Sequence, residues 1–498
     1  IIGDYMWRDT QTVYPHPAWE KTNWSRVNTA WYQREITVPE AWAGRRVALS
    51  IEYLNSYAEV YLDGGKMGEI RFPGGEVDLT PGCRPGIKQV LSLFTAAMPL
   101  NAVIQSFRDT NAVKDEEGRV SRRGLCGDVF LTSTPVDFRI TDVKVETSTR
   151  KGEITVEAGV QGLMADTQYA LRARILDGGQ AVKEIASRPF AAGDLKGGRF
   201  AFTDPWMPEK LWDLHTPQNM YEIQVSLLDS GGAVLDIFQP ARFGFREFWI
   251  DGRDFILNGS RVFCFAVPFD NAQVSAAAAS YPEARETLLR LKAIGVNAVY
   301  THNYGCEPGS HLGFGEILKA ADDVGMLVFF SQPHFAHYDW KAPDADQANG
   351  YALHAEFYVR QAQNHPSVVM YAMSHNSTGY EEDMNPDLID GVHAVRNEWS
   401  ERNAKLALRA EAIVKQLDGS RIVYHHAGGN LGVMHTSNFY LNFTPIQERS
   451  DWFEHWATEG IKPLFLCEYG EPWGIDWTLY RGWYQGKRDF GGAKLPWQ

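Results

Sequence analysis

The sequence of 498 residues is short of cysteine, of long apolar runs and of basic charge, and each shortage excludes a class of protein. Five cysteines without CxxC spacing give no reason to expect a disulfide scaffold or a zinc site. No apolar run approaches the roughly 18 residues that a membrane helix needs, so we expect no membrane as a partner. The 62 acidic residues outnumber the 48 lysines and arginines, and the formal net charge of −14 argues against a nucleic-acid partner.

The first residues also lack the basic start and the apolar core of an export signal. Such a signal could have been removed, and the few cysteines leave the compartment open. Of the compartments, we favour a periplasmic or secreted location over a cytoplasmic one.

What the chain does have is length and aromatic rings. A chain of 498 residues exceeds what one hydrophobic core usually supports, so two to four domains are expected. Aromatic residues make up 13% of it, with 16 tryptophans and 21 tyrosines, and rings of this kind either fill large cores or stack on sugars. We expect a carbohydrate as the ligand and leave a homo-oligomer open.

The first half of the chain has the pattern of two β-sandwiches. In residues 1–137, short bursts that alternate apolar and polar residues, such as 31–38, 47–51 and 58–62, are separated by Pro, Gly and Asn turns. Residues 138–244 contain about seven further short runs, which fit an immunoglobulin-like sandwich. The predicted domains are therefore 1–137, 138–244 and 245–498.

The third part alternates strands with amphipathic helices, which indicates a (β/α)8 barrel. The predicted strands are 262–266, 296–300, 326–330, 367–373, 421–424, 438–441 and 463–467. The predicted helices are 282–294, 316–324, 351–363 and 398–417. No apolar run after the seventh strand qualifies as an eighth, so another segment would close the barrel or the chain would continue.

Polar residues gather at the carboxyl ends of these predicted strands, where barrel enzymes place their active sites. Twelve of the 14 histidines lie beyond residue 300. The seventh strand ends on a carboxylate, Glu468, which either touches a substrate or forms a structural ion pair. We predict that the substrate-binding residues are His302, Asn303, Gln332, His334, His425, Tyr440 and Trp473.

Several segments resemble glycoside hydrolase family 2. Residues 30–70, AWYQREITVPEAWAGRRVALSIEYLNSYAEVYLDGGKMGEI, resemble its N-terminal jelly-roll domain, which we describe as sugar-binding-like. The passage FGFREFWIDGRDFILNG, residues 243–259, resembles the entry into the family's barrel. The resemblance implies a jelly roll, an immunoglobulin-like sandwich and a (β/α)8 TIM barrel, and an exo-acting hydrolase of β-linked galactosides or uronides.

The same resemblance assigns the catalytic residues. Glu468 falls on the family's nucleophile, within EYG. The segment HPSVVMYAMSHN, residues 365–376, aligns with the strand that carries the acid/base, but the acid/base position holds Asn376, preceded by His375. The family's strand-two arginine is replaced by Tyr300, and the family's Tyr that holds the nucleophile corresponds to Tyr440.

Because an amide cannot donate a proton as a general acid, three explanations stay open. In the first, His375 or a carboxyl of Glu381, Glu382 or Asp383 supplies the proton, with a pKa raised toward the working pH. In the second, the position is a loss that leaves a catalytically silent carbohydrate-binding protein. In the third, His302, His334, His375 and His425 bind a metal, but no HxxxH or HxH spacing supports it, so we expect neither metal nor cofactor.

Overall fold

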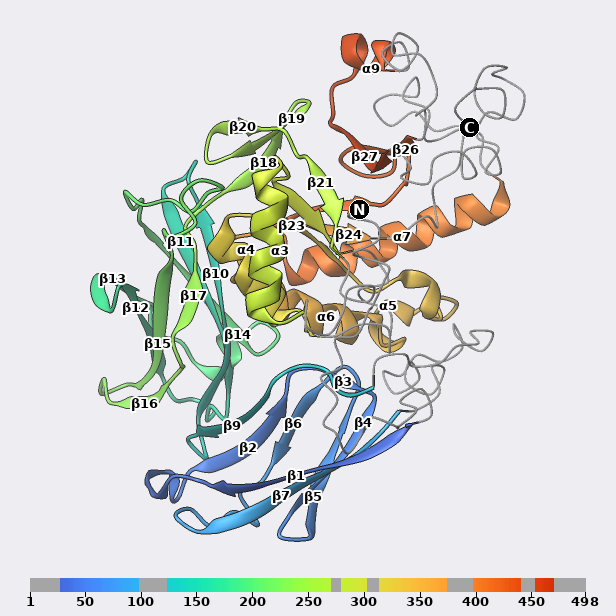
Figure 1. The fold of residues 1–498 in the computed structure, drawn as a ribbon. Coiled ribbons are helices and arrows are strands. Elements are labelled where there is room, and N and C mark those ends of the chain that lie inside the picture. The colour runs from blue at the N-terminus through green and yellow to red at the C-terminus, as the bar shows by residue number, and fades with distance from the viewer. Residues whose placement is uncertain are drawn as a thin grey trace.

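The computed structural model describes residues 27–97, 123–269, 279–301, 313–373, 397–439 and 453–469. Three blocks follow one another along the chain: two blocks of antiparallel strands and one of parallel strands with helices (Figure 1). None of the helices in these ranges has the length and the apolar composition needed to cross a membrane.

The first block contains two main antiparallel sheets. One has the spatial order β1 (Thr29–Thr37), β7 (Lys88–Ala96), β4 (Tyr57–Leu62) and β5 (Gly65–Arg71). The other is β6 (Gly75–Asp78), β2 (Arg46–Ile51) and β9 (Val129–Thr134), and β3 (Leu54–Asn55) pairs with β8 (Gly124–Leu125). In β4 the residues alternate between partly exposed and buried, because successive side chains of a strand point to opposite faces. The buried face joins the apolar core of this block.

The second block also contains two sheets. The first is β10 (Arg139–Ser148), β11 (Glu153–Gln161) and β14 (Arg199–Pro205). The second is β13 (Gln180–Ala186), β12 (Tyr169–Asp177), β15 (Tyr221–Asp229) and β16 (Val234–Ile237), with β17 (Ala241–Phe243) also paired to β15. Both sheets contribute to one apolar core. The finer assignment of the blocks as a jelly roll and an immunoglobulin-like sandwich stays a prediction, as do the exact domain boundaries.

The third block holds the parallel strands. Five of them form one sheet in chain order: β21 (Ala266–Pro268), β22 (Ala298–Tyr300), β23 (Leu327–Ser331), β24 (Val368–Met373) and β25 (Ile422–His425). A second parallel pair is β26 (His435–Phe439) and β27 (Leu464–Tyr469). The described residues thus contain seven parallel strands.

The first barrel strand differs from the prediction of residues 262–266. An antiparallel sheet of β18 (Phe248–Asp251), β19 (Asp254–Leu257) and β20 (Ser260–Val262) precedes it. Because Val262 pairs with Phe255 in that sheet, the parallel strand begins only at Ala266. The predicted sixth strand, 438–441, is also corrected, since β26 begins three residues earlier, at His435.

The α-helices of the described ranges are α3 (Tyr281–Ala293), α4 (Gly315–Val324), α5 (Ala345–Ala348), α6 (Tyr351–Ala362), α7 (Glu398–Leu417) and α9 (Glu454–Glu459). The four predicted helices correspond to α3, α4, α6 and α7, each within one residue at either end, and α5 and α9 were not predicted. Helix α4 ends at Gly325, whose φ of 71° favours glycine and whose Cβ, if present, would lie 2.6 Å from the carbonyl oxygen of Leu214. The buried faces of α3, α4, α6 and α7 share one apolar cluster with Tyr53 and Phe72 of the first block.

Alternate barrel strands fill the interior with rings. Phe329 from β23, Tyr424 from β25 and Phe465 from β27 contact one another edge to face, with ring centroids 5.3 to 6.2 Å apart. Layers supplied by alternate strands are typical of TIM barrels. Burial of each ring stabilises the fold by about 1.5–3 kcal/mol, and the layer forms a solid floor beneath the strand ends.

Candidate functional site

Glu468 reaches the barrel interior through an irregularity in β27. Ser437 of β26 pairs with Leu466, but the next residue, Asn438, pairs with Glu468. Cys467 is therefore an extra residue in β27, opposite no residue of β26. Phe465 and Cys467 belong to the interior cluster, and strict alternation would send Glu468 to the opposite face. A β-bulge sets two successive residues against one and re-aims the side chains. The bulge therefore lets Cys467 and Glu468 face the same side.

The partner of Glu468 is His426, directly after β25. Its Nε2 lies 2.9 Å from Oε1 of Glu468, and its backbone N–H donates to the carbonyl oxygen of Met373 at 2.8 Å. The imidazole is nearly fully buried, whereas the Glu468 side chain keeps 22% of its surface exposed. A buried donor thus holds one carboxylate oxygen while the carboxyl group stays accessible to a small molecule.

The preceding residue, His425, points the other way. Its side chain is 0% exposed, and its Nε2 lies 2.8 Å from Oε2 of Glu411 on α7. Tyr424 faces the interior, so alternation sends His425 to the helices and returns His426 to the interior. Among the two histidines, the structure brings His426 and not the predicted His425 to Glu468. The sequence could have indicated His426 through the alternation of inward-facing and outward-facing side chains along residues 422–426.

Near this pair lies an apolar cluster that contains Tyr300, Tyr424, Cys264 and Cys467. The ring of Tyr300, at the position of the family's arginine, lies 5.9 Å from the ring of His426. Burial raises the pKa of the Cys467 thiol and of the Cys264 thiol to about 12, and burial raises the pKa of Tyr424 well above its ordinary value. These groups are neutral near pH 7, so neither thiol competes with the carboxylate as a nucleophile.

Two further predicted site residues lie at the end of β23. Gln332 is fully buried, its backbone N–H donates to Ala372, and its side-chain amide has no hydrogen-bond partner among the residues that the structure describes. His334 begins a short 3₁₀ helix, where its Nδ1 accepts a hydrogen bond from the backbone N–H of Ala336 at 3.1 Å. Their roles in substrate binding stay predictions.

The other predicted site residues lie outside the described ranges. They are His302, Asn303, His375, Asn376, Tyr440 and Trp473, and the alternative proton donors Glu381, Glu382 and Asp383 lie there as well. Within the described ranges, no three or more His, Cys, Asp or Glu side chains are placed to hold a metal ion. Two of the four histidines of the metal hypothesis, His334 and His425, are accounted for by the contacts given above.

Two family descriptions match adjoining parts of the chain. "Glycosyl hydrolases family 2, TIM barrel domain" matches residues 246–476, and "Glycosyl hydrolases family 2" matches residues 138–246. Among curated proteins, the β-glucuronidase of Paenibacillus borealis is 26% identical over 392 residues, covering 72% of this chain and 60% of that protein. The human β-glucuronidase is 24% identical over 493 residues, covering 89% of this chain and 69% of that protein.

Solved structures show the same fold. The β-glucuronidase 2 of Bacteroides uniformis, covalently bound to cyclophellitol-6-carboxylate aziridine, has a TM-score of 0.60 at 18% identity, over 89% of this chain and 53% of that chain. The β-galacturonidase of Eisenbergiella tayi, bound to galacturonate, has a TM-score of 0.61 at 17% identity, over 89% and 74%. This chain spans about half to two thirds of the length of the curated relatives that it matches. With both family descriptions in sequence along residues 138–476, the chain belongs to glycoside hydrolase family 2.

Proposed function

We propose that this protein hydrolyses β-linked glycosides, with Glu468 as the nucleophile. The observation that carries the proposal is the accessible carboxylate at the end of β27, held by the imidazole of His426 at 2.9 Å. A retaining glycosidase needs one carboxylate that attacks the anomeric carbon and one acid that protonates the leaving oxygen. The bulge at Cys467 and the buried donor give Glu468 a fixed aim, as the first of these roles requires.

We take a β-uronide as the first substrate class and a β-galactoside as the second. The matched relatives named β-glucuronidase and β-galacturonidase support the first choice, and the family also contains a matched β-galactosidase. We further propose exo-action, in which one terminal sugar is released. A panel of aryl β-glycosides that includes the glucuronide, galacturonide and galactoside ranks these substrates directly.

The proton donor is a separate part of the proposal, because Asn376 cannot be the acid. We propose that His375 or one of the carboxyls among Glu381, Glu382 and Asp383 supplies the proton. An activated aryl leaving group departs without help from an acid, whereas an alkyl or sugar leaving group needs one. The donor is identified by the variant that loses activity on the alkyl β-glycoside but keeps activity on the aryl β-glycoside. The variants to compare are His375→Gln, Glu381→Gln, Glu382→Gln and Asp383→Asn.

The test of the nucleophile is the variant Glu468→Gln. It keeps the shape and a hydrogen bond to His426 but removes the attacking charge, so kcat/KM should fall by roughly 10⁴-fold or more. The matched control is Glu411→Gln, which changes a buried carboxylate held by the neighbouring His425, and it should retain most of the activity. Measured turnover that is equal in parent and Glu468→Gln would contradict the assignment. A parent without turnover on the whole panel would instead favour a carbohydrate-binding protein on the same fold.

A further inference from the structure

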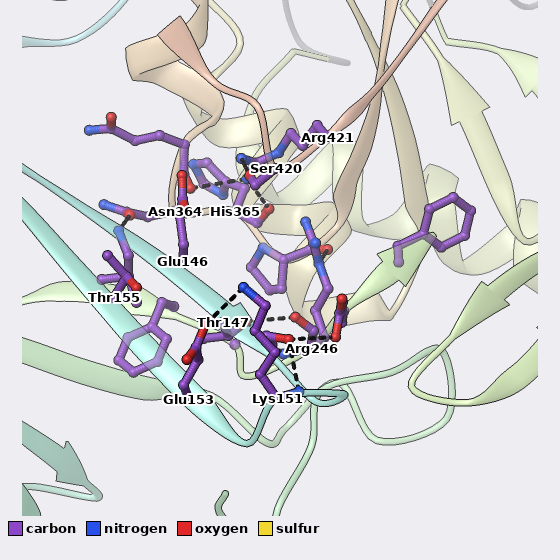
Figure 2. A pocket seen from close by; sticks show the side chains of 18 of the residues that line it. Glu146, Thr147, Lys151, Glu153, Thr155, Arg246, Asn364, His365, Ser420 and Arg421 are labelled. Atoms are coloured by element: carbon purple, nitrogen blue, oxygen red, sulfur yellow. Dashed lines mark hydrogen bonds and ion pairs between the residues drawn. The ribbon is translucent and has the colours of Figure 1, made fainter. Parts of the chain in front are cut away.

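A cavity of about 260 Å³ lies at the opposite end of the barrel strands from Glu468, against the second block (Figure 2). Residues 145–148 of β10, the loop 363–366 before β24 and the loop 419–421 before β25 form much of its wall. Its volume equals that of roughly eight or nine molecules of liquid water, which suits a small ion or one sugar acid. The established family fold gives this end of a barrel no chemical role.

Arg246 lines the cavity and is unusual because it is buried and no carboxylate of the described residues forms an ion pair with it. The residue is only 8% exposed. Its Nε donates to the carbonyl oxygen of Pro366 at 3.0 Å and its Nη2 to that of Val368 at 2.6 Å, but within the described ranges it forms no ion pair and its Nη1 has no hydrogen-bond partner. Buried charges in proteins are normally paired. Arg246 therefore has a donor and a positive charge to offer a ligand.

The charged side chains nearest to Arg246 are paired mainly with one another. Lys144 lies 2.5 Å from Glu146 and 3.3 Å from Asp418, and Arg421 lies 2.5 Å from Asp418. Asp322 also acts on Arg246 electrostatically, so with Arg246 the cluster contains three cations and three carboxylates, but within the described residues none of these carboxylates forms an ion pair with Arg246. Burial, together with the nearby charge of Arg421, lowers the pKa of Arg246 to about 9, so it is still mainly charged at pH 7.

The carboxylates on the cavity wall do not oppose an incoming anion strongly, because each already has its own cation. Glu146 is paired with Lys144, Glu153 lies 3.2 Å from Lys151, and Glu247 lies 2.5 Å from Arg150. These pairs leave Arg246 without an ion pair of its own within the described residues. They also place its charge beneath a rim of compensated surface groups.

A second nitrogen group lines the same cavity. His365 has its Nδ1 2.6 Å from Oδ2 of Asp322, and the other oxygen of Asp322 accepts the backbone N–H of Ser367 at 3.1 Å. These contacts fix the imidazole while 24% of its side chain stays exposed. Figure 2 shows His365 and Arg246 on the wall of one cavity, so a ligand held by Arg246 would lie within a preformed and rigid setting.

We propose that this cavity binds a small oxyanion, with Nη1 of Arg246 donating to it. Carboxylate and phosphate oxygens match an arginine donor, and the free acid of one sugar unit and inorganic phosphate both fit the volume. The shared chemistry is a compact anion with at least two acceptor oxygens. The site is independent of the hydrolytic proposal, because it lies at the other end of the strands and uses none of the residues near Glu468.

Thermal unfolding and titration calorimetry of the full chain test this site. The probes are inorganic phosphate, sulfate and glucuronate at constant ionic strength, with glucose as the neutral match to glucuronate and chloride as the salt control. We expect saturable binding and a rise of the unfolding midpoint of about 2–4 °C near saturation. A response to glucuronate alone assigns the site to a sugar acid, and a response to phosphate or sulfate assigns it to an inorganic oxyanion. No response to any of the three anions overturns the proposal.

Three variants locate the binding. Arg246→Gln should abolish the response, and Arg246→Lys, which keeps the charge but loses Nη1, should weaken binding at least tenfold. Lys151→Gln, which removes an exposed cation from the rim of the same cavity, should leave the affinity within about threefold of the parent. If Arg246→Gln does not fold, Arg246→Lys decides. Parental affinity in either soluble Arg246 variant overturns the proposal.

Discussion

The two ends of the barrel strands hold their carboxylates in different ways. At the carboxyl end, Glu468 contacts the imidazole of His426 and remains 22% exposed. At the amino end, Asp418 is 0% exposed and is bound by Arg421, by Lys144 and by the hydroxyl of Tyr371 at 2.8 Å. A carboxylate surrounded by cations and closed to solvent can only stabilise the fold, whereas one that stays open can also meet a substrate. Barrel enzymes separate stability and chemistry along the strands in this way.

The amino-end cluster also joins two blocks of the chain. Lys144 belongs to β10 of the second block, whereas Asp418 and Arg421 flank the start of β25. Burial raises the pKa of Asp418, but the charges of Arg421 and Lys144 outweigh it and hold that pKa far below its ordinary range. The carboxylate is therefore ionised near pH 7.

The largest expected effect on stability comes from Asp418→Asn. The change leaves Arg421, Lys144 and Arg246 with one carboxylate fewer, and removal of one partner from a buried ionic cluster typically costs about 3–5 kcal/mol. We expect a lower midpoint in urea, with kcat/KM of the folded protein preserved. The control is Glu286→Gln, which breaks the exposed pair with Arg290 and should cost less than about 0.5 kcal/mol. Equal midpoints for the two variants would contradict this view of the amino end.

Much of the fold could be predicted from the sequence, because the apolar residues of its long helices recur at helical spacing and the helices end at recognisable residues. Helices α4 and α7 lie within one residue of prediction, and Gly325 ends α4 as expected. The first barrel strand was predicted at residues 262–266, but it begins only at Ala266. The apolar residues of that stretch are equally compatible with the edge strand of an antiparallel hairpin, to which Val262 belongs. Apolarity alone does not tell a parallel strand from the antiparallel one that precedes it.

The site was predicted less completely, for three physical reasons. Glu468 was found because a carboxylate ends an apolar run, but the bulge at Cys467 depends on how β27 pairs with β26, which no local pattern reveals. The choice between His425 and His426 depends on the phase of β25. The surroundings of Arg246 come from residues that are far apart in the chain and form one cluster only after folding.

A smaller effect, on activity rather than on stability, is expected at His426. In His426→Gln the imidazole donor to Glu468 is lost or displaced, and a hydrogen bond to a charged group is worth about 1.5–3 kcal/mol, so kcat/KM should fall roughly tenfold to hundredfold. His426 is a positioning residue, and the acidic limb of the pH–rate profile should move to higher pH. The matched change His425→Gln should lower the urea midpoint and leave both kcat/KM and the profile unchanged. Identical kinetics in the two variants would remove His426 from the site.

The smallest expected effect concerns Glu411, the carboxylate behind the site. Burial raises its pKa, but hydrogen bonds from His425 and Lys415 outweigh burial and hold the pKa below its ordinary value of 4.5. A carboxyl whose pKa is lower in the folded state than in the unfolded state contributes stability that is complete above the unfolded pKa and is lost as the pH falls from there through the folded pKa. Urea midpoints of the parent should therefore decline below about pH 4.5 more steeply than those of Glu411→Gln. Because His425 and Lys415 lose a partner in the variant at every pH, its stability at pH 7 is lower, and only the slope reports the titration. Parallel declines in parent and variant would show that Glu411 is not held ionised by its neighbours. The difference between the closed environment of Glu411 and the open one of Glu468 would then consist only of their solvent exposure.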